Sequence, residues 1–323
     1  MIIPPATQLP PELLLDIFSH LQNAGDEKQE ADQASLKSAT LVCRAFTEPA
    51  QAILWQSGAT LEGAGDIAKF IKSASRRRVG PKEMTVKDGR DAIDEKLLIR
   101  LWEHIRGVER LTIISGETRV SAETFSYSAL ADLKSLGLCV RLKPSKSTTS
   151  LPFELNKLNL IDTEILTPHQ ASFLSTIARS SSSSMRTLSL SSISGSAHSA
   201  VSRSILPFAP NLRHLGLSNE SAHDPVHYVR FLESTRSLRS LECTSLPLPL
   251  LHSLPVSLKG LATMEESRDL QVDQLKIAFE RLKGLERLYF ACSRKEFEEV
   301  EGGIELVKEM EKREVDWHFA EDY

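Results

Sequence analysis

The stretch LKSLGL, residues 133–138, has apolar residues at its first, fourth and sixth positions. This L-x-x-L-x-L pattern, with some replacements, recurs along most of the chain: PKEMTV from Pro81, VERLTI from Val108, LNKLNL from Leu155, MRTLSL from Met185, LRHLGL from Leu212, LRSLEC from Leu238, LKGLAT from Leu258 and LERLYF from Leu285. Successive copies start 27, 25, 22, 30, 27, 26, 20 and 27 residues apart. Such a regular period predicts a repeat architecture.

Apolar residues between the copies recur at helical spacing. These groups are Ile93, Leu97, Leu101 and Ile105; Phe173, Leu174 and Ile177; Val226, Val229, Phe231 and Leu232; and Leu275, Phe279 and Leu282. Each unit is therefore predicted to run as strand, loop, helix and return. Stacked units would form a parallel sheet on the concave side and a layer of helices on the convex side. Period and pattern together resemble the leucine-rich repeats.

The composition is that of an ordinary folded protein. Of the 323 residues, 41% are hydrophobic and 25% charged, and the low aromatic content of 6% favours a core of aliphatic side chains. The net charge of -4 provides no long-range attraction to nucleic acid or anionic lipid. The one compact basic run, Arg76, Arg77 and Arg78, is interpreted as a solvated loop, with nucleic-acid contact as the alternative.

Cysteine spacing argues against both disulfides and zinc. Cys43, Cys139, Cys243 and Cys292 lie far apart and form no C-x-x-C pair, which favours buried thiols in a reducing compartment. We expect neither a signal peptide in residues 1–8 nor a membrane span, because no apolar run is long enough. The expected location is cytoplasmic, nuclear or both.

The N-terminal stretch LPPELLLDIFSHLQ, residues 9–22, predicts a helix that Pro10 and Pro11 begin. One side of this helix is continuously apolar, formed by Leu13, Leu14, Ile17, Phe18 and Leu21. After a polar gap at 23–35, a second helix would carry Leu36, Ala39, Val42, Cys43 and Phe46 on one face, and a third would carry Ile53, Leu54 and Trp55. Three helices this short bury little against one another.

The order of these residues resembles an F-box. Its pattern, L-P-x-E-(apolar)-x-x-x-I-(F/L)-x-x-L, then L-x-x-(A/S)-x-x-V-C-(R/K)-x-(W/F), then L-W, is matched by Leu9, Pro10, Glu12, Leu13, Ile17, Phe18, Leu21, Leu36, Ala39, Val42, Cys43, Arg44, Phe46, Leu54 and Trp55. The gap at 23–35 is longer than is usual in the family, and Phe46 stands where tryptophan is common.

F-box domains bind the small adaptor subunit of a cullin–RING (SCF-type) ubiquitin ligase, and the domain that follows binds the protein to be ubiquitinated. The resemblance therefore implies an α/β chain with an F-box over residues 1–60 and a leucine-rich-repeat solenoid over 61–323. It implies a non-enzymatic substrate receptor with two partners, the adaptor and an unknown target. The implied adaptor-binding residues are Leu9, Pro10, Leu13, Ile17, Phe18, Leu21, Leu36, Val42, Cys43, Phe46 and Trp55.

Two alternatives stay open. In a ligase-independent interaction scaffold, the N-terminal helices would instead bind an adaptor without recruiting a cullin, or form the cap that a repeat stack requires. An enzyme is the third class, although the sequence has no phosphate-binding loop, no G-x-S-x-G and no H-E-x-x-H. His223 and His227 flank Pro225 without a third ligand, so they predict a helix start with Asp224 as its N-cap, not a metal site. No cofactor or metal is expected.

The concave face is read from the positions between and after the leucines, at the third, fifth and seventh places of each copy. By this reading charge gathers toward the N-terminal repeats, and the middle of the face is small and neutral. We expect the target at Arg110 and Lys157 near one end and at Arg287 and Tyr289 near the other. Recognition by loops at the strand ends, or no recognition at these solvated positions, are the alternatives.

The remaining segments are predicted to finish the fold. Residues 293–319 predict a C-terminal cap, with a charged helix interrupted at Gly302 and Gly303 and then a last strand around Val315 to Phe319. The alternative for this acidic segment is a partner-binding tail. The serine-rich stretches 145–150, 179–185 and 189–199 are interpreted as loops of variable length, with phosphorylation as the alternative.

Overall fold

The structure, a computed structural model, describes residues 10–22, 29–42, 46, 49–50, 53, 58–74, 80–146, 148–163, 165, 167–218, 225–264 and 272–319. Its main body is a sheet of eleven parallel strands, arranged in space in the order of the chain. The strands are β1 (Ala59–Glu62), β2 (Glu83–Lys87), β3 (Arg110–Val120), β4 (Ser135–Leu142), β5 (Lys157–Leu160), β6 (Thr187–Ser191), β7 (His214–Ser218), β8 (Ser240–Cys243), β9 (Gly260–Thr263), β10 (Arg287–Phe290) and β11 (Asp316–Phe319).

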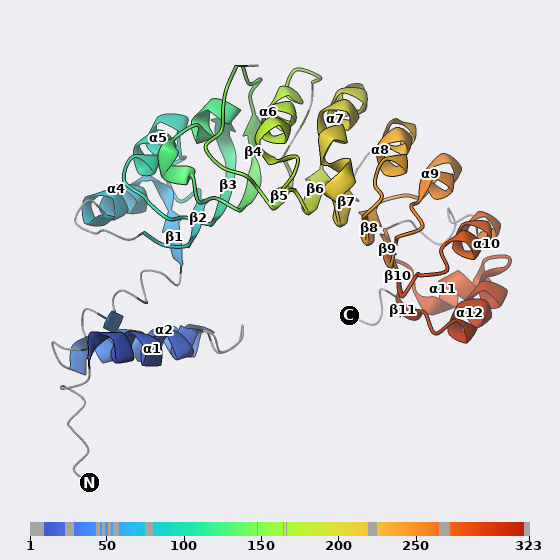
Figure 1. Cartoon of the computed structure of the whole chain (residues 1–323), viewed down its shortest axis with the longest axis horizontal. Helices are drawn as coiled ribbons and strands as arrows, with labels where there is room; N and C mark the ends of the chain where they lie inside the picture. The colour runs from blue at the N-terminus through green and yellow to red at the C-terminus, as the bar shows by residue number, and fades with distance from the viewer. Residues whose placement is uncertain are drawn as a thin grey trace, which may run out of the picture.

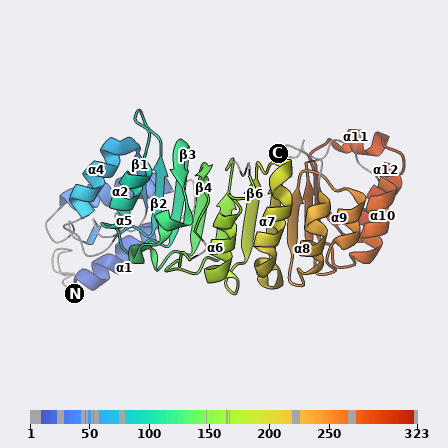
Figure 2. The same ribbon diagram turned by 90° about the horizontal axis from the view of Figure 1, so that it is seen from above.

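Helices line the outer side of this sheet, so the body is an arc with a concave sheet and a convex helical layer (Figure 1). Seen from above, strands and helices follow one another along the arc in chain order (Figure 2). The helices are α4 (Gly63–Ala74), α5 (Glu95–Trp102), α6 (Ser172–Ser181), α7 (His198–Ile205), α8 (Val229–Glu233), α9 (Leu248–Ser253) and α10 (Val272–Arg281), with 3₁₀ turns η3 (Ala122–Phe125), η4 (Ser128–Leu130), η5 (Gly195–Ala197), η6 (Leu206–Asn211) and η7 (Pro225–Tyr228). The predicted solenoid is confirmed.

The strand register explains why the leucine pattern makes this fold. The fourth positions of the copies are paired across the sheet in one row: Met84, Leu111, Leu136, Leu158, Leu188, Leu215, Leu241, Leu261 and Leu288. All of these side chains are buried, as are the first and sixth positions of the strongest copies. Each buried leucine contributes roughly 1.5–3 kcal/mol relative to exposure. Stacking therefore joins the apolar side chains of all repeats into one continuous core.

Backbone hydrogen bonds also align the residues that come just before each strand. The amide groups of Arg213 and His214 both donate to the carbonyl of Arg186, at 2.8 and 3.0 Å. The amide groups of Arg239 and Ser240 do the same to the carbonyl of Arg213 one repeat later, at 2.8 and 3.0 Å. This repeated fork places the second position of each copy next to its counterpart in the neighbouring repeat.

The structure adds one strand that the pattern search did not find. In β1, only Leu61 matches the pattern: Ala59 occupies the place of the second leucine, and Gln56 would occupy that of the first. The strand forms because β2 offers it a paired edge, to which Ala59 aligns at Met84 and Leu61 at Val86. Backbone pairing at a sheet edge thus replaced the missing apolar residues.

The helix bounds differ from the predicted ones in two places. The second N-terminal helix, α2 (Gln29–Val42), already begins inside the stretch predicted as a polar gap. Residues 29–35 are rich in Gln, Glu and Ala, which have good helix propensity and need no apolar face, so the gap is shorter than predicted. On the convex side, α5 ends at Trp102, and Ile105 is buried from the loop instead of the helix.

The C-terminal segment, predicted to form a cap, has two helices and a last strand. It consists of α11 (Arg294–Glu299), α12 (Gly303–Lys312) and β11, with the predicted break at Gly302, whose φ of 81° favours glycine. Trp317 and Phe319 of β11 stack at 5.8 Å between ring centroids and cover the last apolar layer. Arg313 donates to the carbonyl groups of Phe279 and Leu282, at 2.9 and 2.8 Å, and so completes the end of α10.

The N-terminal helices form a small body of their own. Pro11 begins α1 (Pro11–Gln22), as predicted, and Figure 1 shows α1 and α2 apart from the helical layer of the arc. The buried residues described here are Leu14, Phe18, Leu36, Ala50 and Ile53, in a cluster separate from the core of the sheet. A cluster of five side chains stabilises a body of this size only marginally.

A carboxylate anchors the segment that follows β4. Oε1 of Glu123, in η3, accepts hydrogen bonds from the Lys146 amide at 2.5 Å and from the Thr149 hydroxyl at 2.8 Å. Partial burial raises the pKa of Glu123, but hydrogen bonds from the Lys146 amide and from the side chains of Ser121 and Thr149 outweigh it and lower the pKa from 4.5 to about 2. The fold therefore stabilises the ionised form.

This gives a prediction for acid stability. Because the folded pKa of Glu123 lies below its ordinary value, its contribution is complete above pH 4.5 and is lost as the pH falls toward about 2. Glu123→Gln should lower the free energy of unfolding by about 1 kcal/mol at pH 7 and should flatten its decline between these values. Urea titrations at several pH values test this, with Thr149→Ala expected to give part of the effect. Parallel curves for wild type and Glu123→Gln would contradict it.

Candidate functional site

The apolar side of α1 is divided into two stripes. Leu14 and Phe18 point into the small N-terminal cluster and are 2% and 5% exposed. Leu13 and Ile17, one residue earlier in each turn, are 50% and 51% exposed. Leucine and isoleucine side chains four residues apart lie on the same helix face, so Leu13 and Ile17 form an apolar strip with half of its surface open to solvent.

The end of α2 exposes two further apolar side chains. Leu41 is 87% exposed and Val42 is 68% exposed. Surface of this kind on a small helical body is typical of a protein-binding site. Leu41 was not among the predicted binding residues because it lies off the apolar face formed by Leu36, Ala39 and Val42.

The predicted adaptor-binding residues therefore differ in position. Leu13, Ile17, Val42 and Pro10 are exposed, whereas Phe18 and Leu36 are buried inside the helical cluster. Phe46 packs edge to face against Phe18, with ring centroids 5.6 Å apart. The backbone of Leu21 lies in α1, and Leu9, Cys43 and Trp55 lie outside the described residues. The exposed residues can contact a partner. The buried residues hold the helices together and so keep the exposed residues in position.

On the concave face, the two N-terminal candidates have different surroundings. Arg110 on β3 is held by Glu83 of β2 through two hydrogen bonds, of 3.0 and 2.7 Å, so its charge is already neutralised. Lys157 on β5 is exposed and has no ion pair with any described acidic residue. The structure thus leaves Lys157 available to a ligand and engages Arg110 within the sheet.

The two C-terminal candidates lie together. Arg287 and Tyr289 of β10 both line an open cavity of about 470 Å³, with Glu242 of β8 and His318 of β11 among the other lining residues. Gly260 of β9 lies beside Arg287, since a Cβ atom at that position would be in ordinary contact with the guanidinium, at 3.9 Å. The cavity extends over four strands, so it belongs to the concave face as a whole.

A row of cations at the second position of the copies was missed. In β6 to β9 this residue is Arg186, Arg213, Arg239 or Lys259, stacked through the backbone forks described above. The prediction of a small and neutral middle covered only the third, fifth and seventh positions, so it did not include this row. The signal was present in the sequence, since the strings MRTLSL, LRHLGL, LRSLEC and LKGLAT all carry it.

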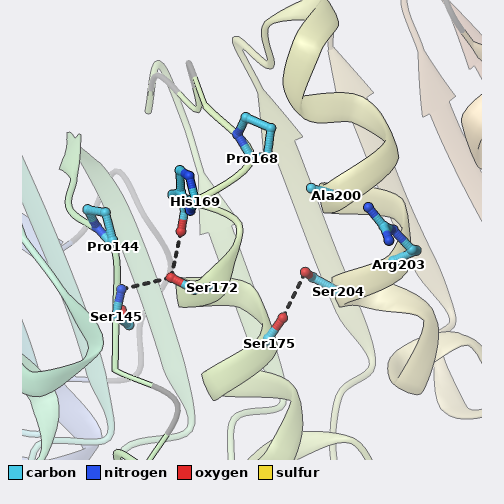
Figure 3. Close-up of a pocket in the computed structure, with 9 residues that line it drawn as sticks. All are labelled: Pro144, Ser145, Pro168, His169, Ser172, Ser175, Ala200, Arg203 and Ser204. Carbon is cyan, nitrogen blue, oxygen red and sulfur yellow. Dashed lines mark hydrogen bonds between the residues drawn. The ribbon is translucent and has the colours of Figure 1, made fainter.

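The cavity on the convex side has no catalytic arrangement of its side chains. It measures about 440 Å³ and lies between the start of α6 and α7, lined by Ser172, Ser175, Arg203 and others (Figure 3). Ser172 donates its hydroxyl hydrogen to the backbone carbonyl of His169 at 2.6 Å, not to the imidazole ring, and Ser175 donates to Ser204 at 2.8 Å. A nucleophile would need a base at that place.

The described cysteines and histidines also form no catalytic or metal-binding arrangement. Burial raises the pKa of Cys139 and of Cys292, which keeps both as thiols. His227 stacks on the buried His198, with ring centroids 6.4 Å apart, and His223 and Asp224 lie outside the described residues. Across the described part of the chain, no three metal-ligating side chains come together. Each helix described is too short or too polar to span a lipid bilayer.

Comparison with known proteins bears on the N-terminal body. No curated protein matches the chain. Residues 6–58, which include the exposed strip on α1 and the buried cluster beneath it, match the family model of F-box-like domains. The match ends where the sheet begins, at β1. An F-box-like domain therefore precedes a solenoid with eleven parallel strands.

Proposed function

We propose that this protein is a substrate-recognition subunit of a cullin–RING (SCF-type) ubiquitin ligase. Its F-box-like domain binds the adaptor subunit of the ligase, and its arc binds the protein to be ubiquitinated. Catalysis belongs to the other subunits, and this chain contributes proximity and orientation. The observation that carries the proposal is the exposed Leu13 and Ile17 strip within the F-box-like match.

The apolar strip on α1 would be stabilised by a partner that covers it. Two half-exposed aliphatic side chains on α1, together with Leu41 and Val42 on α2, present apolar surface that the described part of this chain does not cover. Burying one such side chain in a partner contributes roughly 1.5–3 kcal/mol. An adaptor that covers the strip would supply the other half of a core that five buried side chains only begin.

We propose that the domain boundary, predicted at residue 60, lies at the start of β1, with the adaptor-binding domain before this strand and the arc from it onward. The separate apolar clusters support this division. Within the first domain, Leu13, Ile17 and Val42 are proposed to contact the adaptor, and Phe18 and Leu36 to hold the helices in place. In the arc, the target is proposed to contact the concave face, at Lys157 near the middle and at Arg287 and Tyr289 near the C-terminal end.

A ligase-independent scaffold is the second candidate. In that protein the N-terminal helices bind an adaptor, or cap the arc, without recruiting a cullin. Capping would require apolar contact between the helices and the sheet, whereas the described buried side chains form two clusters. This observation favours docking over capping, and an assembly experiment separates docking with a cullin from docking without one.

The experiment is reconstitution of the full chain with the purified adaptor and cullin subunits of the same organism. Size-exclusion chromatography with light scattering should give a complex that contains one copy of each. A complex with the adaptor that excludes the cullin would support the scaffold. Absence of any complex with the adaptor would contradict both forms of the docking proposal.

A further inference from the structure

The middle of the concave face is rich in cations. Six of them lie at the second or third position of their copies, on or just before β4, β5, β6, β7, β8 and β10; the corresponding cation of β9, Lys259, is paired with Glu286 and is not counted among them. We call them the basic band; its members are Lys134, Lys157, Arg186, Arg213, Arg239 and Arg287. The strand register places Lys157, His214 and Arg287 in one row, and the backbone forks place Arg186, Arg213 and Arg239 in the adjoining row.

The basic band is less neutralised than the N-terminal end of the sheet, although Arg239 and Arg287 lie near enough to Glu286, the partner of Lys259, to help lower the pKa of that carboxyl group. At the N-terminal end of the sheet, cations are paired across strands: Lys87 with Glu62 at 3.1 Å and Arg110 with Glu83 at 2.7 Å. By contrast, no member of the band forms an ion pair with an acidic residue in the parts of the chain that the structure describes. Even Asp316, the register partner of Arg287, is bonded to His318 instead, at 3.0 Å.

The cations of the basic band lie close enough to repel one another. Neighbouring parallel strands lie about 4.8 Å apart, so successive members repel one another across the surface. The pKa of His214 is lowered by burial and also by the positive charges of four cations, which come from four different repeats: Arg213, Arg239, Arg287 and Lys157. Unpaired like charges in a row are unfavourable for the free protein and attract an anionic partner.

The surface next to the band is open to a polypeptide backbone. The fifth positions of β4 to β7 are Gly137, Asn159, Ser189 and Gly216, and none of them bears a long side chain. The third and fifth positions of β4 to β7 include no acidic residue, and the first acidic side chain of these rows beyond them is Glu242 of β8. Small side chains let a ligand backbone approach the sheet here, and the basic band runs along one edge of this small-residue surface.

We propose that the basic band binds an extended acidic segment of the target protein, which crosses the strands from β5 to β10 with its anionic side chains on Arg213, Arg239 and Arg287. This deepens the proposed function by naming the chemistry of the target. Five strand spacings amount to about 24 Å, which an extended chain covers with about seven residues. A peptide fits better than nucleic acid, because the net charge is -4 and the middle strands offer no aromatic stacking platform.

The test uses the full chain and labelled ten-residue peptides, without the adaptor. One probe alternates glutamate and serine, a second alternates alanine and phosphoserine, a third alternates lysine and serine, and a ten-nucleotide single-stranded DNA completes the set. Fluorescence anisotropy should show binding of an acidic peptide that weakens as salt is added. Binding of the glutamate peptide assigns carboxylates, binding of the phosphoserine peptide alone assigns phosphates, and either result supports the proposal.

Matched variants locate the site. The double variant Arg213→Glu with Arg239→Glu should weaken binding of the acidic peptide at least tenfold. The control, Arg203→Glu with Arg230→Glu, makes the same charge change on α7 and α8 of the convex side and should stay within twofold of wild type. Arg213→Gln with Arg239→Gln, which removes charge without reversing it, keeps the test valid if the reversal disturbs folding. Circular dichroism checks the fold of each variant.

Three results would overturn the proposal: equal weakening by the convex control, binding of the lysine peptide as tight as that of the acidic peptides, or preference for the DNA over both acidic peptides. Absence of any peptide binding by the wild type would also overturn it. None of these results touches Leu13 or the adaptor, so failure here is distinguishable from failure of the proposed function. An arc without affinity for acidic segments would still be joined to a docking F-box-like domain.

Discussion

Replacing Leu13 by aspartate is expected to abolish adaptor binding while leaving the fold intact. The side chain is 50% exposed, so the change costs the isolated chain less than about 0.5 kcal/mol. In the complex the same change removes an apolar contact of roughly 1.5–3 kcal/mol and buries a charge without a partner. Together these terms predict at least about a hundredfold loss of affinity, measured by calorimetric titration of the full chain with the adaptor.

The neighbouring residue provides the matched control. Leu14→Asp makes the same chemical change one position along α1, but that side chain is 2% exposed and belongs to the N-terminal cluster. It should unfold this cluster, which circular dichroism would register as lost helix.

The outcome separates the two roles of the N-terminal helices. Loss of binding with an unchanged spectrum and melting temperature indicates that Leu13 faces the adaptor. Retained binding by Leu13→Asp would remove the exposed strip from the interface. A lower melting temperature of the whole arc in this variant would indicate a cap instead, because only a cap joins α1 to the sheet.

Replacing Phe173 by alanine should give a large loss of stability in the arc. Phe173 on α6 is completely buried, and its ring meets that of Phe125 at 6.2 Å in an edge-to-face arrangement. The deletion leaves a cavity in a core that cannot collapse onto it, at a cost of about 3–5 kcal/mol. For a body of this size, the melting temperature should fall by about 6–20 °C, measured by calorimetry or by circular dichroism.

A control on the same helix isolates the cavity. Ser175→Ala removes an exposed hydroxyl that donates to Ser204 at 2.8 Å, and should change stability by less than about 0.5 kcal/mol. Because the buried side chains of the sheet form one cluster from Leu61 to Phe319, the arc should melt in one transition. Separate melting of its N-terminal and C-terminal repeats would contradict a continuous core.

The two variants together test whether the domains are independent. Below its melting temperature, Phe173→Ala should bind the adaptor as wild type does, because Leu13 and Phe173 belong to different bodies. Likewise, Leu13→Asp should bind an acidic peptide on the basic band with unchanged affinity. A substrate receptor needs this independence, since one domain must hold the ligase while the other varies with the target.

Much of the fold followed from the apolar pattern. Leu133, Leu136 and Leu138 are buried in their predicted places, and the same holds for the corresponding residues of the other strong copies. Such a pattern is informative because each position recurs and a one-residue shift would expose an entire row. The cap at Gly302 was predictable for a related reason, since glycine after a charged helix marks a break.

Other features could not be read locally. The pattern search passed over β1 because a strand at the edge of an existing sheet needs few apolar residues of its own. Residues 29–35 lack an apolar face and therefore predict a polar gap between the first two helices, yet in the structure they belong to α2. The basic band was readable from the second letters of four copies and was missed only because that position was left out.

By itself, the sequence determined that the chain repeats, that its leucines line one core, and that an F-box-like segment precedes the repeats. Local spacing carries that information, because a row of apolar residues at a regular period must share one buried face. Only the tertiary structure decided that Leu14 is buried while Leu13 is not, that Glu83 neutralises Arg110, and that Arg213 and Arg239 lie beside each other without an ion pair. The first of these facts depends on how the N-terminal helices pack together, and the other two depend on stacking of the strands, which makes residues of different repeats neighbours.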